Sequence, residues 1–375
     1  MSGQSEGPRG APLAPVTGGP LASTAGQVKV ALLLPLSGPN ADLGKAMLDA
    51  AQLALFTMGG ESLTLVPRDT GGTPEGAAKA ARSAVDEKVG LILGPLLAGE
   101  VQAVKPIAAG ANINVIAFST ATQLAGGNIF LMGFLPHDEA VREVAFARER
   151  GLQRFAALLP NSPYGRLMND ALREAAAATG GSVGKVEYLD PRNPDTTLAV
   201  QHVMGGSGAA GPAATATFDA LLLPEGGAQL KQLAAQIKAA EGQSGKIQLL
   251  GSGLWDDPSI VGDPALAGGW FASSPPDARR DFENRYQGAY RRPPPRLASL
   301  AFDSAALAAV LAKSGGDNPF SRDAILNPSG FSGVDGLFRF TQGGLVQRGL
   351  AVIEVGATGD SVVSPAPHSF AGTGM

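Results

Sequence analysis

Hydrophobic positions along the chain form short continuous runs that alternate with amphipathic stretches. The first run, Val28–Leu36, is apolar and of strand length, which is typical of a strand covered on both faces. In Asp42–Met58, apolar side chains recur every three or four positions, which predicts a helix with one buried face. The pattern then repeats. Leu63–Val66 predicts a strand, and Thr73 followed by Pro74 is typical of an N-cap and first helical position.

The same alternation continues through the first two thirds of the chain. Strands are predicted at Val89–Gly94, Ile113–Phe118, Ile129–Phe134, Arg154–Leu159, Val183–Leu189, Asp219–Leu223 and Ile247–Leu250. Helices are predicted from Thr73 to Lys88 and at Val101–Ala109, His137–Arg150, Tyr164–Thr179, Thr196–Met204 and Gly227–Glu241. Pro106 is expected to kink its helix or delay its start. This alternation predicts parallel sheets with helices on both faces, in two successive units.

The last third of the chain has a different pattern. Asp277–Tyr290 and Leu297–Lys313 predict helices, while Leu337–Phe340 and Gly349–Val355 predict a closing pair of strands. We expect the chain to return to the first unit and then to finish on the second. Before this part, Gly205–Thr217 consists mostly of Gly, Ala and Thr and is predicted to be a surface loop.

Composition supports a globular protein and excludes several functions. The chain has 375 residues, more than one typical domain, and its 44% hydrophobic and 17% charged residues are a normal globular balance. A net charge of −4 argues against nucleic acid as a partner. There is no Cys, which excludes thiolate catalysis and disulfides, and the 3 His residues are not at metal-ligand spacing. No apolar run reaches membrane-spanning length.

The motifs of enzymes built on doubly wound sheets are missing. The loop after the first strand, Leu36–Asn40, lacks a dinucleotide-binding glycine pattern, and the chain has neither a phosphate-loop lysine nor a nucleophile elbow. Arg68 and Asp69 could serve a ligand, but capping or structural pairing is the simpler interpretation. Because no nucleophile and base set is visible, we expect a protein that is not an enzyme and has no catalytic residue, metal or cofactor.

The N-terminal segment Met1–Gly26 is rich in Pro, Gly, Ser and Ala and is expected to be disordered. It has neither the positive nor the apolar region of a signal peptide. Two interpretations stay open. The segment is a leader from cloning, or it is the tether of a lipoprotein in which Met1 stands where a lipidated Cys was removed. A lipid anchor would be the only link to a membrane.

Ligands of open parallel sheets bind beyond the carboxyl ends of the strands, where loops here offer hydroxyls and backbone N–H groups. Each such residue also fits ordinary capping. Trp255 either packs in a core or forms a stacking wall for a ligand, and Tyr164 has the same two alternatives. The expected ligand-binding residues are Ser37, Asn40, Leu43, Leu97, Ala98, Ser119, Thr120, Thr122, Tyr164, Glu225, Ser252, Leu254 and Trp255.

Several segments together resemble the type I periplasmic solute-binding proteins of the leucine/isoleucine/valine-binding group. They read VALLLPLSGPNADLGKAMLDAAQLAL, VGLILGPLLAG, VIAFSTAT, FAALLPNSPYGRLM and FDALLLPEGG. The resemblance implies an α/β fold of two Rossmann-like lobes, each a doubly wound, mainly parallel sheet, joined by a three-crossing hinge around a ligand cleft. It implies lobe 1 at residues 28–135 and 274–332, lobe 2 at residues 136–273 and 333–358, a leader or tether at residues 1–27 and a flexible tail at residues 359–375.

The resemblance implies a periplasmic protein that binds a small molecule as the receptor of an ABC transporter, with a permease as partner. The segments GPLLAGE, VIAFST, GFLPHDEAV and GFSGVDGLFRF resemble more closely the penicillin-binding protein activator-like envelope lipoproteins. They imply an alternative function, the regulation of peptidoglycan synthesis through contact with a penicillin-binding protein. Of the three functions considered (transport receptor, regulator of peptidoglycan synthesis and enzyme), an enzyme is the least favoured.

The loops that hold an amino acid in such relatives are altered here. Leu97 and Ala98 stand where serines bind the ligand carboxylate, although Thr122 and Tyr164 match the family pattern. Near Gly253 there is no acidic residue to hold a ligand ammonium. Because unpartnered buried charges are costly, we expect a neutral or weakly polar ligand and not a free branched-chain amino acid.

Overall fold

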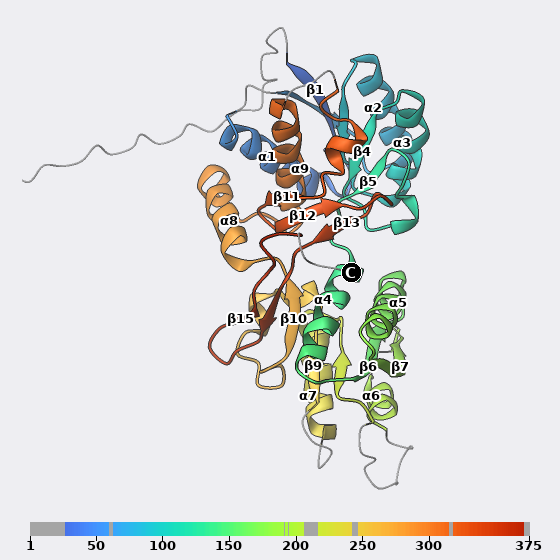
Figure 1. The fold of residues 1–375 in the computed structure, drawn as a ribbon, viewed down its shortest axis with the longest axis vertical. Coiled ribbons are helices and arrows are strands. Elements are labelled where there is room, and N and C mark those ends of the chain that lie inside the picture. Colours follow the sequence, from blue (N-terminus) through green and yellow to red (C-terminus); the bar gives the residue numbers. More distant parts are fainter. Residues whose placement is uncertain are drawn as a thin grey trace, which may run out of the picture. The chain divides into compact units, whose positions relative to one another are not determined.

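A computed structural model divides the chain into two compact units (Figure 1). Unit 1 comprises Met1–Met132 and Arg280–Ile325, and unit 2 comprises Gly133–Arg279 and Leu326–Met375. The chain therefore passes between the units three times, a few residues from the crossings expected near Leu135, Ser273 and Ser332. The structure describes residues 27–59, 63–190, 192–193, 195–205, 217–241, 247–314 and 318–370. The predictions for Met1–Gly26 and for most of Gly205–Thr217 lie outside them.

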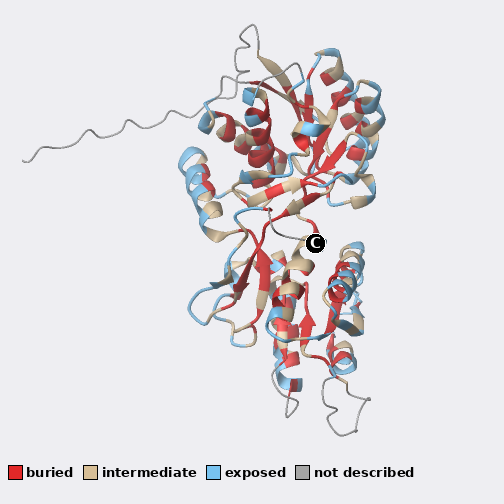
Figure 2. Cartoon of the chain, in the orientation of Figure 1, coloured by how far each residue is buried: buried red, intermediate tan, exposed pale blue. Residues whose placement is uncertain are grey.

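Unit 1 is built on a five-stranded parallel sheet with the order β2-β1-β3-β4-β5. Residues 30–34 of β1 are completely buried, as the continuous apolar run predicts. Figure 2 shows burial concentrated along these strands. The strands are β1 (Val28–Leu34), β2 (Leu63–Asp69), β3 (Leu91–Leu93), β4 (Asn114–Ala117) and β5 (Ile129–Leu131).

Helices cover this sheet, and α1 packs against α9, which comes from the far end of the chain. Pro106 lies inside α3, which begins three residues before the predicted start at Val101. The earlier start is stabilised by Glu100, whose side chain accepts a hydrogen bond from the Leu97 N–H. The elements are α1 (Ala41–Thr57), α2 (Pro74–Asp86), α3 (Ala98–Gly110), η1 (Thr122–Leu124), α8 (Pro276–Tyr290, across the unit boundary), α9 (Ala298–Ser314) and α10 (Arg322–Ile325).

Unit 2 is built on a seven-stranded mixed sheet with the order β15-β14-β10-β9-β8-β6-β7. Its strands β6 to β10 run parallel, whereas β14 is antiparallel to β10 and β15 is antiparallel to β14. The strands are β6 (Arg154–Pro160), β7 (Ser182–Leu189), β8 (Ala220–Leu222), β9 (Gln248–Leu250), β10 (Trp270–Ser273), β14 (Ala351–Glu354) and β15 (Ser361–Ser364).

The helices of unit 2 enclose an apolar core on each side of the sheet. None of the described helices combines the length and apolar character needed to cross a bilayer. The helical elements are α4 (Pro136–Glu149), α5 (Pro163–Ala178), α6 (Thr197–Met204), α7 (Gly227–Glu241), η2 (Gly253–Trp255) and η3 (Pro258–Ile260).

The closing pair of strands predicted at Leu337–Phe340 and Gly349–Val355 is wrong. The first of these is β12 (Gly336–Phe340), which lies between β11 (Phe331–Gly333) and β13 (Val346–Arg348) in a separate antiparallel sheet. A tight turn, closed by a 2.8 Å hydrogen bond from the Thr341 N–H to the Leu345 carbonyl, reverses the chain into β13. The second prediction corresponds to β14, which pairs with β10 instead.

The flexible tail predicted at residues 359–375 is also wrong for its described part. It contains β15, which pairs with β14, and the Ser364 hydroxyl lies 2.6 Å from the Arg142 guanidinium. Phe370 is buried beneath the guanidinium of Arg339. Backbone pairing and these arginine contacts hold the segment on unit 2.

Candidate functional site

The loop that follows β1 in unit 1 is held by Asp69, the last residue of β2. Its Oδ1 accepts hydrogen bonds from the N–H groups of Leu36 (2.8 Å), Ser37 (3.1 Å) and Gly71 (2.8 Å). Burial opposes ionisation of Asp69, but the hydrogen bonds outweigh it and hold the pKa of the carboxyl below its usual value. Arg68 turns away and pairs with Glu87. Both residues are therefore structural, which is the simpler interpretation drawn from the sequence.

Three glycines in first helical turns allow the helix backbone to pack directly against the residues that follow or end a strand. A Cβ atom would lie 2.1 Å from the Pro35 carbonyl oxygen at Gly44, 2.0 Å from the Thr70 oxygen at Gly76, and 1.9 Å from the Pro160 oxygen at Gly165. Real Cβ atoms essentially never come within 3.0 Å of such atoms, so these positions require glycine. The first turns of α1, α2 and α5 are thus fixed beside the loops that carry predicted ligand donors.

The ligand residues predicted in unit 1 lie in loops and helix starts after three adjacent parallel strands, β1, β3 and β4. The sheet therefore brings them to one edge. Ser119 is the most buried, at 5% exposure, and its Oγ accepts a hydrogen bond from the Ala121 N–H at 3.2 Å. Ser37, Ala98 and Thr120 are exposed, while Asn40, Leu43, Leu97 and Thr122 are partly exposed.

In unit 2, Tyr164 occupies the first turn of α5, after β6. Its hydroxyl lies beside Ser252, a fully buried residue after β9. Burial raises the pKa of Tyr164 well above its usual value, and the neighbouring carboxylates Glu139, Glu143 and Glu225 add to this rise. The structure therefore brings together Tyr164, Ser252 and Glu225, three of the residues predicted from the sequence.

Glu139 is the site residue that the sequence reasoning missed. It lies on α4, and its Oε2 accepts a 3.1 Å hydrogen bond from the Gly253 N–H across 114 residues of sequence. A Cβ atom on Gly253 would lie 2.7 Å from Glu139 Oε1. The expectation that no acid stands near Gly253 is therefore wrong, because a helix supplies the carboxylate that the loop lacks. No local sequence signal could have shown this.

Two further carboxylates lie in the same part of unit 2. Glu143, one helical turn after Glu139, is 1% exposed, and its Oε1 accepts a hydrogen bond from the Ala272 N–H at 2.8 Å. Burial raises the pKa of Glu143 well above its usual value. Burial also raises the pKa of Glu225, which follows β8. Glu143 Oε2 and Glu225 Oε1 are buried and have no hydrogen-bond partner among the described residues.

Trp255 does not form a wall for a ligand. It is completely buried in the core of unit 2, where its Nε1 donates a 3.0 Å hydrogen bond to the Leu223 carbonyl. Two glycines make room for the ring: a Cβ atom would lie 2.2 Å from it at Gly251 and 2.7 Å from it at Gly269. Its neighbour Leu254 is 50% exposed and stays available.

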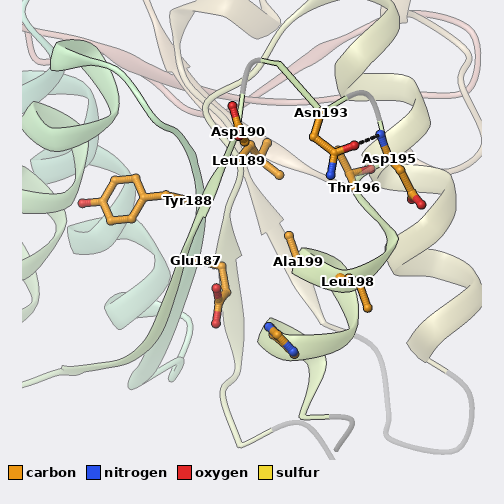
Figure 3. A pocket seen from close by; sticks show the side chains of 10 residues that line it. Glu187, Tyr188, Leu189, Asp190, Asn193, Asp195, Thr196, Leu198 and Ala199 are labelled. Carbon is orange, nitrogen blue, oxygen red and sulfur yellow. Dashed lines mark hydrogen bonds between the residues drawn. The ribbon is translucent and has the colours of Figure 1, made fainter. Parts of the chain in front are cut away.

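A hollow of about 210 Å³ lies elsewhere in unit 2, between the end of β7 and α6 (Figure 3). It shares no residue with the group around Tyr164. Two of its three acids are already engaged, because Asp190 pairs with Arg192 and Asp195 accepts the Thr197 N–H. No group of three metal-ligating side chains occurs in the described part of the chain. We therefore place the candidate site at Tyr164. The hollow is lined by Glu187, Tyr188, Leu189, Asp190, Asn193, Asp195, Thr196, Leu198, Ala199 and His202.

Comparison with known proteins gives a consistent result. A family model described as periplasmic binding protein matches residues 27–360. A putative branched-chain amino acid ABC transporter protein from Rhodospirillum rubrum has a TM-score of 0.76 at 20% identity, over 90% of this chain and 100% of that one. A solute-binding protein from R. palustris in complex with benzoate has a TM-score of 0.61 at 20% identity, over 92% and 99%.

A branched-chain amino acid substrate-binding protein from Streptococcus pneumoniae, in complex with isoleucine, has a TM-score of 0.58 at 20% identity, over 90% of this chain and 100% of that one. At these identities the likeness shows the fold. Among curated proteins, an uncharacterised protein of Rickettsia prowazekii is 22% identical over 212 residues. That match spans 56% of this chain and 57% of the relative, so the chain matches little more than half of the relative's length.

Proposed function

Since the chain belongs to the periplasmic binding protein family, we propose that it is the solute receptor of an ABC transporter and delivers a small molecule to a permease. The family consists of binding proteins and not of enzymes. A location in the periplasm follows from the proposed role, and the lipoprotein tether at Met1–Gly26 stays a prediction.

The observation that carries the proposal is the junction of Tyr164 and Ser252 at the carboxyl ends of β6 and β9, with Glu139 against Gly253. Strand ends are where open parallel sheets bind ligands. We propose that the solute is recognised by residues at and beside such strand ends. The residues are Ser37, Asn40, Leu43, Leu97, Ala98, Ser119, Thr120 and Thr122 of unit 1, and Glu139, Tyr164, Glu225, Ser252 and Leu254 of unit 2.

The direct test is native mass spectrometry of the freshly purified full chain, which should reveal a co-purified small molecule. The Tyr164→Phe variant should bind that molecule about tenfold more weakly, because one hydrogen bond to the ligand is lost. Tyr188→Phe is the matched control, since Tyr188 lies on β7 and is 38% exposed. Absence of any bound solute, together with no response to a broad thermal-shift screen, would contradict the proposal.

Calorimetric titration of the full chain with leucine, isoleucine and valine tests whether it binds amino acids. Leu97 and Ala98 offer no hydroxyl to a ligand carboxylate, so leucine, isoleucine and valine should bind only weakly. Micromolar affinity for one of them would show that backbone N–H groups at the helix starts replace the missing side chains.

A second candidate function is the activation of a penicillin-binding protein. The segment GFSGVDGLFRF, which supports this resemblance, forms β11, β12 and the turn between them in the small antiparallel sheet. Retention of a penicillin-binding protein by the immobilised full chain, unaffected by Tyr164→Phe, would favour this function over transport.

A further inference from the structure

Strand β7 forms one edge of the sheet in unit 2, and among the described strands it pairs only with β6. On the β6 side, the Leu189 carbonyl accepts the Asn161 N–H. Because backbone groups alternate in direction along a strand, the N–H and C=O groups of Val186 and Tyr188 face outward. No hydrogen bond from another described segment reaches these groups. A bulge interrupts the strand between Val183 and Val186, so the regular outer edge begins at Val186.

The hollow described above runs along this same part of β7, on the face of the sheet that α6 covers. Leu189 lies in one buried cluster with Val200 and Val203 of α6. Glu187 comes two residues before Leu189, so its side chain lies on the α6 face as well. The ring of Tyr188 is directed away from the hollow, to the other face (Figure 3). An open strand edge and a hollow therefore lie side by side.

The hollow is acidic. Glu187, Asp190 and Asp195 line it, and no Lys or Arg does. Asp190 and Asp195 are engaged, whereas the Glu187 side chain makes neither a hydrogen bond nor an ion pair with another described residue. Lys185, on the same strand, donates to the His202 carbonyl at 2.8 Å. The Glu187 carboxylate is thus available to a positively charged group from outside.

We propose that the outer edge of β7 and the hollow, together called the β7 groove, bind an extended segment of a partner protein. The segment adds a strand to β7 and places a lysine or arginine side chain against Glu187. In strand addition, main-chain hydrogen bonds supply affinity and pockets for alternate side chains supply specificity. An added strand lies about 4.8 Å from β7, and every second side chain points to the face that holds the hollow.

The charge of the β7 groove favours such a partner over a second copy of this chain. Two copies joined in antiparallel order through the regular edge would pair Val186 with Tyr188. This register places the two Glu187 side chains opposite each other, and like charges directly opposite are destabilising. A basic segment instead forms a charge-assisted hydrogen bond with the same carboxylate, which is stronger than a neutral one.

The test is fluorescence anisotropy of the full chain at pH 7 with labelled, capped peptides of about nine alternating threonine and valine residues. One peptide carries lysine at its centre and a second carries glutamate there. We expect the lysine peptide to bind at least about tenfold more tightly than the glutamate peptide. Two further lysine peptides are methylated on either the odd or the even backbone nitrogens. Only every second N–H of an added strand faces β7, so one of these two should lose binding.

Variants of the chain test the two parts of the β7 groove separately. Glu187→Gln should weaken binding of the lysine peptide about tenfold, because the opposite charge is lost. Glu149→Gln, at an exposed position of α4, is the matched control and should leave the affinity unchanged. Tyr188→Pro should weaken binding more than Tyr188→Ala does, since proline alone removes the outward N–H, and edge strands tolerate proline. Circular dichroism checks that each variant is folded.

Hydrogen exchange gives a readout that needs no variant. The amides of residues 182–189 should exchange more slowly when the lysine peptide is bound to the parent chain. No binding of this peptide at about 1 mM, equal binding of the lysine and glutamate peptides, or equal binding of the two methylated peptides would overturn the inference. A dimer in sedimentation that Tyr188→Pro dissociates would make a second copy the occupant and also overturn it.

The inference goes beyond the proposed function and does not depend on it. Glu187 and Tyr188 are not among the residues proposed to recognise the solute, so failure of every peptide would leave the solute receptor standing. Binding of the lysine peptide to a protein that carries no solute would support the β7 groove and count against transport.

Discussion

At the scale of single residues, packing decides which strand-end groups are available to a ligand. Trp255 and Glu139 show why sequence reasoning met its limit there. A tryptophan in a glycine-rich loop can lie inside or outside, and only Gly251 and Gly269 on separate segments make room for its ring. The Glu139 carboxylate reaches Gly253 through tertiary contact alone. By contrast, Tyr164 and Ser252 were predictable, because both follow apolar runs that are plainly strands.

The glycine at position 44 should be irreplaceable. In Gly44→Ala the new methyl group would lie 2.1 Å from the Pro35 carbonyl oxygen. The backbone could relieve this steric clash only by moving α1 away from β1. We expect a loss of about 3 kcal/mol in the free energy of unfolding. Gly110→Ala in α3 is the matched control, since nothing lies within 4 Å of its Cβ position. It should stay within about 1 kcal/mol of the parent. Equal denaturant midpoints for both variants would refute this account.

At the scale of elements, α4 connects the loop at Gly253 to the segment that contains β14 and β15. One face carries Glu139 and Glu143, whereas Arg142 donates to the Leu350 carbonyl at 2.9 Å and to Ser364 at 2.6 Å. The sequence predicted this helix and the parallel strands well, because their apolar runs are long and regular. It did not predict β10, β11, β13 or β15, which have three or four residues each and no clear alternation of apolar and polar positions.

Glu143 should make the stability of the protein depend on pH. Burial raises its pKa in the folded state above the usual value of 4.5, so the folded protein keeps a proton that the unfolded chain releases. Its contribution to stability is therefore fully present below pH 4.5 and is lost as the pH rises through the folded-state pKa. Glu143→Gln cannot ionise, so its stability relative to the parent should increase as the pH rises. The gain is about 1.4 kcal/mol for each pH unit between the two pKa values.

Thermal melts of the parent and Glu143→Gln between about pH 5 and 8 measure this difference. Glu149→Gln serves as control on the same helix and should follow the parent. Parallel curves for the parent and Glu143→Gln would show that Glu143 keeps the same proton occupancy in both states.

At the scale of the whole molecule, neither unit is a continuous piece of chain. The pattern of elements predicted that the chain returns to the first unit and then finishes on the second, whereas the positions of the three passages were predicted through the resemblance to a known family, since no composition change marks the boundaries. Unit 2 gains β14 and β15 from its second segment, after the chain has supplied residues 280–325 to unit 1. The last segment therefore completes a sheet that begins at β6.

Removal of residues 326–375 should unfold unit 2 and spare unit 1. It would strip β14 from β10 and take away the acceptors of Arg142. Limited proteolysis with mass spectrometry should find early cuts within residues 133–279, while fragments of β1 to β5 persist. A protease-resistant core at residues 133–279 would show that the last segment is dispensable.

Because each unit is made of two separate segments of chain, the order of synthesis also determines when each unit can fold. The Tyr290 hydroxyl donates to the Asp49 carbonyl across 241 residues, so α1 leaves the ribosome long before the residue that it contacts. Chains stalled at residue 325 should accordingly remain open to protease throughout unit 2. Domains whose parts emerge together fold as they appear. Here the sheet of unit 1 must wait for α9, and the sheet of unit 2 must wait for β14 and β15, so neither unit is complete until translation is almost over.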